Sequence, residues 1–402
     1  MGIYETLGVR PVVNAAGPLT RLSGMPLHPE VAAAMAEAAQ ACVRIDELQE
    51  AAGRELVAAT GAEAGYVTAG AAAGLALAAS ACVAGLDVAA MDRLPDMTGL
   101  RDEIVIQRAH LTAYSHALRL SGARLVEVGY VGDPGQGACW PWQVEAAISE
   151  RTAALAYSVG YTQGVVPLAE VVEIAHRHGL PVIVDAAAAL PPVENLRRFI
   201  ADGADLVAFS GGKAIGGPQA SGILVGRADL IESVALQHQD MDVYPETWPW
   251  RERYLTTGRL AGPPHHGLGR PMKVGKEEIA GLVVALRRFL ARDHEAEQRG
   301  ESERLATVAA ALDELPGVAV ALAADDNGTP RGYPLLRVRI DATVVGRSAA
   351  EVVNALAEGD PPVAVNQSNL RQGVIGVVAT ALRPGEEGIV AERLRAVLTG
   401  RA

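Results

Sequence analysis

Apolar and polar positions follow two alternating periods along the middle of the chain, from residue 60 to residue 230. Short apolar runs, such as Val182-Ile-Val, are separated by stretches in which apolar residues recur every three or four positions. Strands that helices cover on both faces have such continuous apolar runs. The pattern predicts an α/β domain with a mostly parallel seven-stranded sheet wound by helices. The expected strands are residues 65–68, 103–107, 124–129, 153–157, 181–185, 206–210 and 222–225, with helices at 70–83, 114–120 and 168–178 among them.

The pattern changes after residue 244. Residues 244–271 are rich in Pro, Gly, Trp, His and Arg without a clear period, which favours a long loop or a connection between domains. Beyond it we expect a smaller α+β domain, with helices at 276–296, 303–315, 349–358 and 385–398 and strands at 318–322, 335–340, 363–366 and 373–378. The predicted organisation is an N-terminal arm and helix (1–40) that joins the small domain or a dimer interface, a large domain (41–265) and a small C-terminal domain (266–402).

Composition narrows the cellular setting and the partners. The chain has 402 residues and a net charge of −12, which disfavours nucleic acid and anionic membranes as partners. Its three cysteines lack a paired spacing, so we predict no disulfide framework and no metal site in a cytoplasmic protein. The uncharged stretch between Glu63 and Asp87 is mostly Ala and Gly, which favours a buried strand and helix over a membrane span.

Lysine is rare in this chain, and one of its three positions attracts attention. Lys213 stands in the run Ser-Gly-Gly-Lys-Ala-Ile-Gly-Gly-Pro-Gln directly after an apolar strand. The run is no phosphate-binding Walker loop, because Val207 replaces its first Gly and Ala214 replaces its Ser or Thr. An uncrowded amine on a glycine-flanked turn suits Schiff-base chemistry. The alternative is an ordinary lysine on a surface loop.

Two further strand ends strengthen the first interpretation. Asp185 ends a buried strand, where an acid can pair with the protonated pyridine nitrogen of pyridoxal 5'-phosphate (PLP), and the small Ala187 would let the ring lie flat against the sheet. Residues 66–74 run from a strand into a helix start at Gly70, where free backbone N–H groups can bind a phosphate. Taken singly, each feature also has a purely structural interpretation: Asp185 could cap a turn, and the glycines near Gly70 could allow tight helix packing. Together, the three sites converge on the carboxyl edge of one sheet.

The chain also resembles fold-type I PLP enzymes, and within them the selenocysteine-synthase-like family that includes D-glucosaminate-6-phosphate ammonia-lyase. Residues 8–17, 46–53, 67–74, 210–219 and 269–277 carry the resemblance. It implies that Lys213 holds PLP covalently, that Asp185 contacts the pyridine nitrogen, and that Gly70, Ala71 and Ala72 hold the phosphate with help from Ser210. It also implies at least a homodimer with shared active sites, to which Arg270 contributes from a neighbouring subunit.

The resemblance suggests further site residues. His110 would cover the other face of the ring, with Tyr114 and His116 as alternatives nearby in sequence. Asn14, Thr20 and Arg21 resemble an arm that enters the site and binds substrate. The family's C-terminal arginine is replaced by Thr380, so Arg371 or Arg383 is expected to take over its role.

These residues predict chemistry at the Cα of a small amino-acid-like substrate, an amino acid or an amino-sugar acid. The favoured reaction is α,β-elimination of the ammonia-lyase type, through a Schiff base with the substrate and a carbanion at Cα. A racemase, an epimerase or an aldolase would use the same carbanion. A non-catalytic relative is less favoured, and so is a selenium transferase, because the sequence shows neither a tRNA-binding extension nor a basic surface.

Overall fold

The computed structural model describes residues 2–132, 136–160, 163–239, 242–265, 267–326 and 329–401. The chain forms two compact units. The large unit spans Leu27–Leu290, and the small unit combines Met1–Pro26 with Ala291–Ala402. No helix among the described residues is both long enough and apolar enough to cross a membrane.

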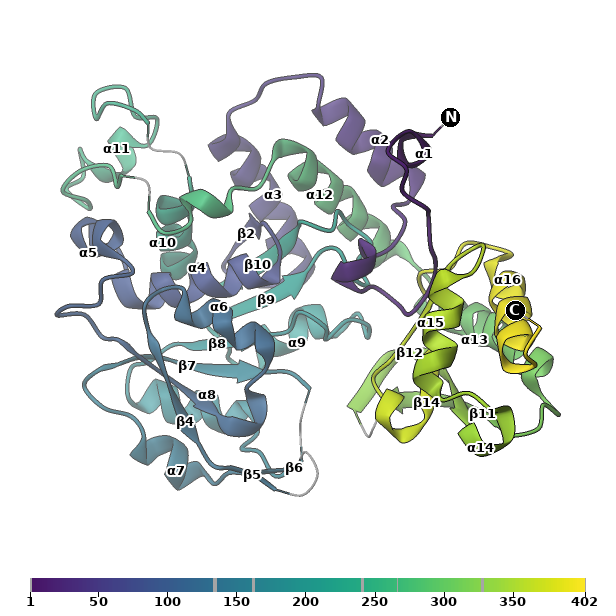
Figure 1. Ribbon diagram of the computed structural model, residues 1–402. Helices are drawn as coiled ribbons and strands as arrows, with labels where there is room; N and C mark the ends of the chain where they lie inside the picture. The colour runs from purple at the N-terminus through teal and green to yellow at the C-terminus, as the bar shows by residue number, and fades with distance from the viewer. Residues whose placement is uncertain are drawn as a thin grey trace. The chain divides into compact units, whose positions relative to one another are not determined.

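A seven-stranded sheet forms the centre of the large unit, in the order β2-β10-β9-β8-β7-β3-β4 (Figure 1). All strands run parallel except β10, which is antiparallel to both of its neighbours. The predicted fold class, an α/β domain with a mostly parallel seven-stranded sheet, is confirmed. The strands are β2 (Ala64–Thr68), β3 (Glu103–Gln107), β4 (Arg124–Val128), β7 (Thr152–Ser158), β8 (Val182–Asp185), β9 (Leu206–Ser210) and β10 (Gly222–Gly226).

Helices cover both faces of this sheet because its strands are apolar on both sides. On one face, Ile183 and Leu224 pack with Leu75 and Leu77 of α4. The helices of the large unit are α2 (Pro29–Ala38), α3 (Ile45–Thr60), α4 (Ala71–Ala84), α5 (Val88–Arg93), α6 (His116–Arg119), α7 (Pro141–Ala146), α8 (Leu168–Arg177), α9 (Asn195–Ala201), α10 (Ala228–His238), α11 (Arg251–Tyr254) and α12 (Lys276–Ala291). A short hairpin, β5 (Tyr130–Gly132) and β6 (Gln136–Ala138), lies outside the sheet.

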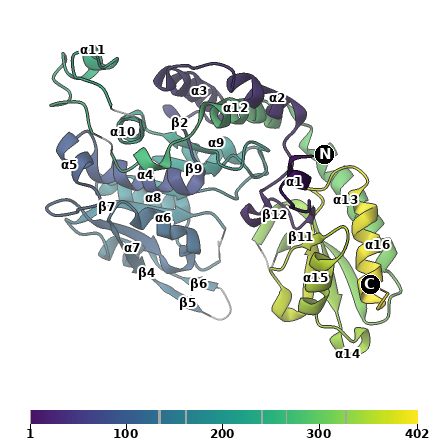
Figure 2. The ribbon, with the colours of Figure 1, turned by 45° about the horizontal axis from the view of Figure 1, so that its top comes forward.

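The opposite face of the sheet packs on α3, α8, α9 and α12. Helices α3 and α12 lie side by side, where Arg287 pairs with Glu55 at 2.6 Å (Figure 2). Ile279, Leu282 and Phe289 of α12 are buried in the same apolar cluster as the sheet residues. The apolar stripe of α12 therefore belongs to the core of the large unit.

The unit boundaries differ from those expected from the sequence. The division falls after Pro26 and after Leu290, whereas the sequence suggested boundaries at 40/41 and 265/266. The difference has a physical cause, because α2 and α12 bury Val31 and Ile279 in the core of the large unit. The predicted helix 276–296 is likewise interrupted, because Asp293 caps the start of α13 and accepts a hydrogen bond from Ala296 N at 2.9 Å.

The small unit packs helices on a three-stranded antiparallel sheet, β11-β12-β14. A two-stranded parallel sheet joins the N-terminal arm to this unit, with Val13 opposite Val363. Its elements are α1 (Ile3–Thr6), β1 (Val13–Ala15), α13 (His294–Leu312), β11 (Val318–Asp326), β12 (Thr329–Ile340), α14 (Ala342–Val345), α15 (Ala349–Glu358), β13 (Val363–Val365), β14 (Val374–Val377) and α16 (Glu386–Leu398).

Candidate active site

The ends of adjacent strands gather polar and small residues at the carboxyl edge of the large sheet. Asp185 at the end of β8 is in register with Ser158 at the end of β7. Ser210 at the end of β9 is in register with Gly222, which faces Thr68 at the end of β2. Each of the five stands two positions along its strand from a residue that packs under α4, so all five lie on the same face of the sheet as α4. Ligands of open α/β sheets bind at this edge.

The turn from β2 into α4 can bind a phosphate group. Gly70 adopts φ +97°, a conformation that favours glycine, and a Cβ placed on it would meet no atom within 4 Å. The first hydrogen bond inside the helix runs from Gly74 N to Gly70 O at 3.1 Å. The N–H groups of Ala71 and Ala72 therefore have no acceptor within α4, and the positive end of the helix dipole lies at the same place.

A close backbone contact holds this turn in place. A Cβ on Gly222 would lie 2.5 Å from the carbonyl carbon of Gly70 and 2.8 Å from Ala71 N. Thr68 Oγ1 donates a hydrogen bond to Gly70 O at 2.9 Å. The absence of a side chain at position 222 thus lets β10 support the start of α4 directly.

Lys213 lies on the compact turn that joins β9 to β10. Within this turn Gly211 N donates to Ser221 O at 2.9 Å, Gly217 N donates to Gly211 O at 2.8 Å, and Gly216 N donates to the carbonyl of Lys213 at 2.8 Å. A Cβ on Gly211 would lie 2.3 Å from Ser221 Oγ. The glycines around the lysine are therefore needed for close backbone packing, which fixes where the lysine side chain begins.

Lys213 and Asp185 form an electrostatic pair at the carboxyl edge. The lysine is half-buried, and burial lowers the pKa of its amine, an effect that the Asp185 carboxylate opposes. Burial raises the pKa of Asp185, while an N–H···O bond from Ala187 N at 3.1 Å and the Lys213 charge oppose that rise. Among the described residues, the Lys213 amine has no salt bridge and no hydrogen bond, so it is available to a ligand.

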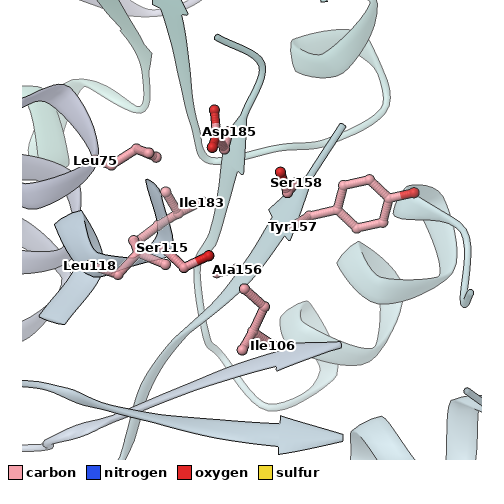
Figure 3. Close-up of a pocket in the computed structure, with 9 residues that line it drawn as sticks. All are labelled: Leu75, Ile106, Ser115, Leu118, Ala156, Tyr157, Ser158, Ile183 and Asp185. Atoms are coloured by element: carbon pink, nitrogen blue, oxygen red, sulfur yellow. The ribbon is translucent and has the colours of Figure 1, made fainter. Parts of the chain in front are cut away.

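A small pocket opens beside Asp185 (Figure 3). Asp185 and Ser158 lie at the ends of neighbouring strands, whereas the ring of Tyr157 points away from them. The lining is mostly apolar with four residues that carry a polar group, and consists of Leu75, Ile106, Ser115, Leu118, Ala156, Tyr157, Ser158, Ile183 and Asp185. Sequence reasoning missed Ser158, Ser115, Thr68 and Gly222. Ser158 was within reach of it, since the serine follows the expected strand 153–157.

His110 is the buried one of the three candidates for the group that covers the cofactor ring. It is 1% exposed and contacts Tyr157 edge to face, with ring centroids 4.3 Å apart. Tyr114 and His116 are exposed. The structure thus brings His110 next to the residue that precedes Ser158, while its expected role over the ring stays a prediction.

Arg270 lies in the large unit, in a short 3₁₀ turn, Arg270–Met272. Its side chain is half-buried, and its charge lowers the pKa of His238, to which burial makes the larger contribution. Gly269 N donates to Gln237 O at 3.1 Å, which fastens this turn to the end of α10.

The five predicted substrate-binding residues belong to the small unit. Asn14 is 7% exposed and uses its side-chain amide within the arm, donating to Gly17 O and Gly24 O at 3.0 Å and accepting from Ala16 N at 3.0 Å. These bonds give Asn14 a role in shaping the arm. The other four, which are exposed, are Thr20, Arg21, Arg371 and Arg383. Their predicted contact with substrate stays a prediction.

The residues present in the large unit fit PLP. Lys213 offers an amine without a protein partner, Asp185 lies close enough to affect its pKa, and Gly70 faces open space at a helix N-terminus. An aldehyde, a pyridine nitrogen and a phosphate need these three kinds of partner. The ends of β8, β9 and β2, which carry or directly precede these groups, lie at the same edge of the sheet.

Comparison with known proteins identifies the family. A family model described as SelA, L-seryl-tRNA selenium transferase, matches residues 20–241. The chain belongs to this family. It is also 34% identical to D-glucosaminate-6-phosphate ammonia lyase from Salmonella typhimurium, over 98% of this chain and 97% of the relative. It is 38% identical to 5'-C-glycyluridine monooxygenase-decarboxylase from a Streptomyces species, over 98% of this chain and 92% of the relative.

Solved structures agree with these relationships. The structure of D-glucosaminate-6-phosphate ammonia-lyase superimposes with a TM-score of 0.82 at 33% identity, covering 100% of this chain and 99% of that one. The structure of SPT with a PLP internal aldimine shares the fold, with a TM-score of 0.57 at 15% identity over 97% of this chain and 89% of that one. The predicted fold type I is confirmed, and so is the assignment to the PLP-dependent lyases.

Proposed function

We propose that this protein uses PLP to eliminate a group from the β-carbon of an amino acid or amino-sugar acid, and that it releases ammonia and a 2-oxo acid. One observation carries the proposal. The unpartnered amine of Lys213 lies close enough to the half-buried carboxylate of Asp185 for each charge to shift the pKa of the other, at the sheet edge where Gly70 begins α4. The full-length relationship to an ammonia lyase supports elimination as the outcome.

Each part of PLP has a protein group suited to it. The N–H groups of Ala71 and Ala72, with the Ser210 hydroxyl, would bind the phosphate. Asp185 would accept a hydrogen bond from the pyridine nitrogen, Ala187 would lie against the ring from the sheet side, and His110 would cover its other face. When bound, PLP supplies the electron sink that stabilises negative charge at the substrate Cα.

Lys213 has two roles in this proposal. Its amine would hold the cofactor covalently until substrate arrives, and would then take the proton from Cα. Burial favours the neutral amine by lowering its pKa, which suits a base that works near neutral pH. Burial also raises the pKa of Asp185, and a cationic ring nitrogen at this place would oppose that rise and favour the charged carboxylate.

A second candidate function has a specific observation behind it. The Streptomyces relative, at 38% identity, is a monooxygenase-decarboxylase. The same residues that make Cα negative could therefore serve an oxygen-dependent loss of CO₂. Such a reaction balances as amino acid plus O₂ giving amide, CO₂ and water. Oxygen uptake with CO₂ release and no ammonia would favour it over elimination. Racemisation and aldol cleavage have no counterpart in either full-length relative.

The decisive experiment adds PLP to purified protein and follows both its absorbance and its products. We expect a yellow protein that releases ammonia from a subset of amino acids and amino-sugar acids. Lys213→Ala should lose the yellow colour and the turnover, whereas the exposed Lys273 serves as the matched control, and Lys273→Ala should retain both. Colour and turnover that survive Lys213→Ala would overturn the assignment.

The assembly and location remain parts of the proposal. We propose a homodimer or higher oligomer with shared active sites, which the family resemblance implies, and a cytoplasmic location, which the absence of a paired cysteine spacing supports. Light scattering of the holoenzyme tests the assembly, since a purely monomeric active enzyme would contradict it.

A further inference from the structure

A buried tyrosine–histidine pair lies next to the proposed site, and the proposed chemistry does not use it. Tyr66 is 3% exposed and His238 is 5% exposed. The Tyr66 hydroxyl is 2.9 Å from His238 Nδ1, and the two rings meet edge to face with centroids 5.3 Å apart. On its other side, His238 Nε2 is 2.9 Å from the carbonyl oxygen of Met272.

These contacts fix the proton positions. A backbone carbonyl can only accept, so His238 Nε2 must carry the proton and donate to Met272 O. A neutral imidazole then has an acceptor at Nδ1, to which the Tyr66 hydroxyl donates. Burial and the nearby charge of Arg270 both lower the pKa of His238, which favours this neutral form. The chain Tyr66 to His238 to Met272 is therefore directional.

This hydrogen-bond chain ends on the turn that carries Arg270. Arg270 N donates to Gly267 O at 2.9 Å, and Met272 N donates to Gly269 O at 2.8 Å, so the turn is compact. A Cβ on Gly269 would lie 2.5 Å from Leu77 Cδ2 of α4. The turn is thus packed closely against the helix whose N-terminus is the proposed phosphate site.

The other end of the hydrogen-bond chain belongs to the strand that leads into the phosphate site. Tyr66 and Thr68 lie on the same face of β2, and Thr68 holds the carbonyl of Gly70. We infer that Tyr66 and His238 are positioning residues, which fix Arg270 so that its guanidinium recognises an anionic group of the cofactor or the substrate. This inference rests on the proposed function, because it assumes that PLP and an acidic substrate are the ligands. It requires only that the turn is fixed, so it applies equally to the site of the same chain and to that of a neighbouring subunit, where the family resemblance places Arg270.

The test measures ligand affinity separately from folding. Tyr66→Phe removes only the hydroxyl. His238→Gln keeps a donor for Met272 O, and His238→Leu removes both bonds. Each variant is titrated by absorbance with PLP and with pyridoxal, which lacks the phosphate, and KM, kcat and melting temperature are recorded. Tyr254→Phe is the matched control, because Tyr254 is also buried and its hydroxyl bonds to Glu232 and not to His238.

We expect Tyr66→Phe and His238→Leu to weaken recognition of one anion about tenfold, the usual size of a misplaced charged hydrogen bond. A loss for PLP but not for pyridoxal identifies the cofactor phosphate. An increase in KM with unchanged PLP affinity identifies an acidic group of the substrate. His238→Gln should lie between wild type and His238→Leu, and Tyr254→Phe should change only the melting temperature.

Arg270→Ala decides whether the pair acts through the arginine. Combining it with Tyr66→Phe should add no further loss of affinity. Both changes weaken affinity through one contact, that of the Arg270 guanidinium with the anion. Fully additive losses, or unchanged PLP affinity and unchanged KM in Tyr66→Phe, overturn the inference. Wild-type protein that takes up no PLP overturns the proposed function as well. Uptake by wild type without this coupling overturns the positioning role alone.

Discussion

Two acids on neighbouring strands of the large sheet show the difference between a structural carboxylate and one prepared for a ligand. Asp205 immediately precedes β9 at the amino edge and is 5% exposed. It accepts hydrogen bonds from Val182 N at 2.8 Å, His176 Nε2 at 2.9 Å and Arg227 at 3.3 Å. Asp185 ends β8 at the carboxyl edge and, among the described residues, its carboxylate accepts a hydrogen bond only from Ala187 N.

The comparison teaches that hydrogen-bond saturation, more than burial, separates the two roles. Protein donors occupy the oxygens of Asp205, so it can only stabilise the fold. Asp185 keeps most of its acceptor capacity, next to the pocket and to the amine of Lys213. An acid left so incompletely satisfied costs stability unless a ligand completes its contacts.

The largest expected effect is that of Asp185→Ala on turnover. Loss of the carboxylate should lower kcat about 10³-fold, because nothing else would hold positive charge on the ring nitrogen. The free energy of unfolding of the cofactor-free protein should stay the same or rise, since burial already disfavours this charge. Steady-state kinetics and urea denaturation check the two halves. A large decrease in the free energy of unfolding with a normal kcat would show that Asp185, like Asp205, has a structural role.

Asp205→Ala should show the opposite behaviour. It leaves the buried Val182 N–H without its acceptor and removes the acid that pairs with His176, while Arg227 loses one of two acidic partners and keeps Asp229. We expect the free energy of unfolding to fall by about 2–3 kcal/mol. Turnover of the folded holoenzyme at low temperature should stay within about threefold of wild type, and a larger kinetic defect would weaken the comparison.

Gly222→Ala tests the phosphate end of the same edge. The added Cβ would press on Gly70 and Ala71, so we expect affinity for PLP to fall about tenfold while pyridoxal binding changes less. Absorbance titration measures both. Gly388→Ala, at a helical glycine of the small unit with open space around it, should leave both affinities unchanged. An equal loss of affinity for PLP and for pyridoxal would contradict a phosphate site at this turn.

The smallest expected effect concerns the pH dependence of stability. The pKa of Lys213 is lowered in the folded protein, so between that value and the ordinary lysine value of about 10.4 the unfolded chain binds more protons. The stability of cofactor-free wild type relative to Lys213→Met should therefore rise as pH rises through this interval. Urea denaturation at several pH values measures it, and a flat or falling difference would contradict the burial of the amine.

Much of the fold follows from local patterns. Short β-rich runs identified all seven strands of the large sheet, and the inner strands gave the clearest signal because helices cover both of their faces. The same patterns did not predict where the two units of the chain divide. Helix α12 looked like part of the small domain, since periodicity reveals an apolar stripe but not the core that buries it.

The candidate site divides in the same way. Asp185 and Gly70 were found because they stand at or just after the end of an expected strand, and Lys213 because lysine is rare and this one lies in a glycine-rich run; all of these are local signals. The Tyr66–His238 pair was not found, because the two residues are 172 positions apart and neither breaks a pattern. Ser115 and Leu75, which line the pocket, were not found for the same reason: only tertiary packing brings them to Asp185.

The amino-acid sequence alone determined the α/β class, the strand ends that carry the lysine and the acid, and the rarity of lysine that drew attention to position 213. Only the tertiary structure decided which acid is saturated and which is free for a ligand, and which of three candidate side chains is buried beside Tyr157. The reason is that strand register, burial and hydrogen-bond partners depend on residues far apart in the chain, whereas a local sequence pattern records only what its own segment requires.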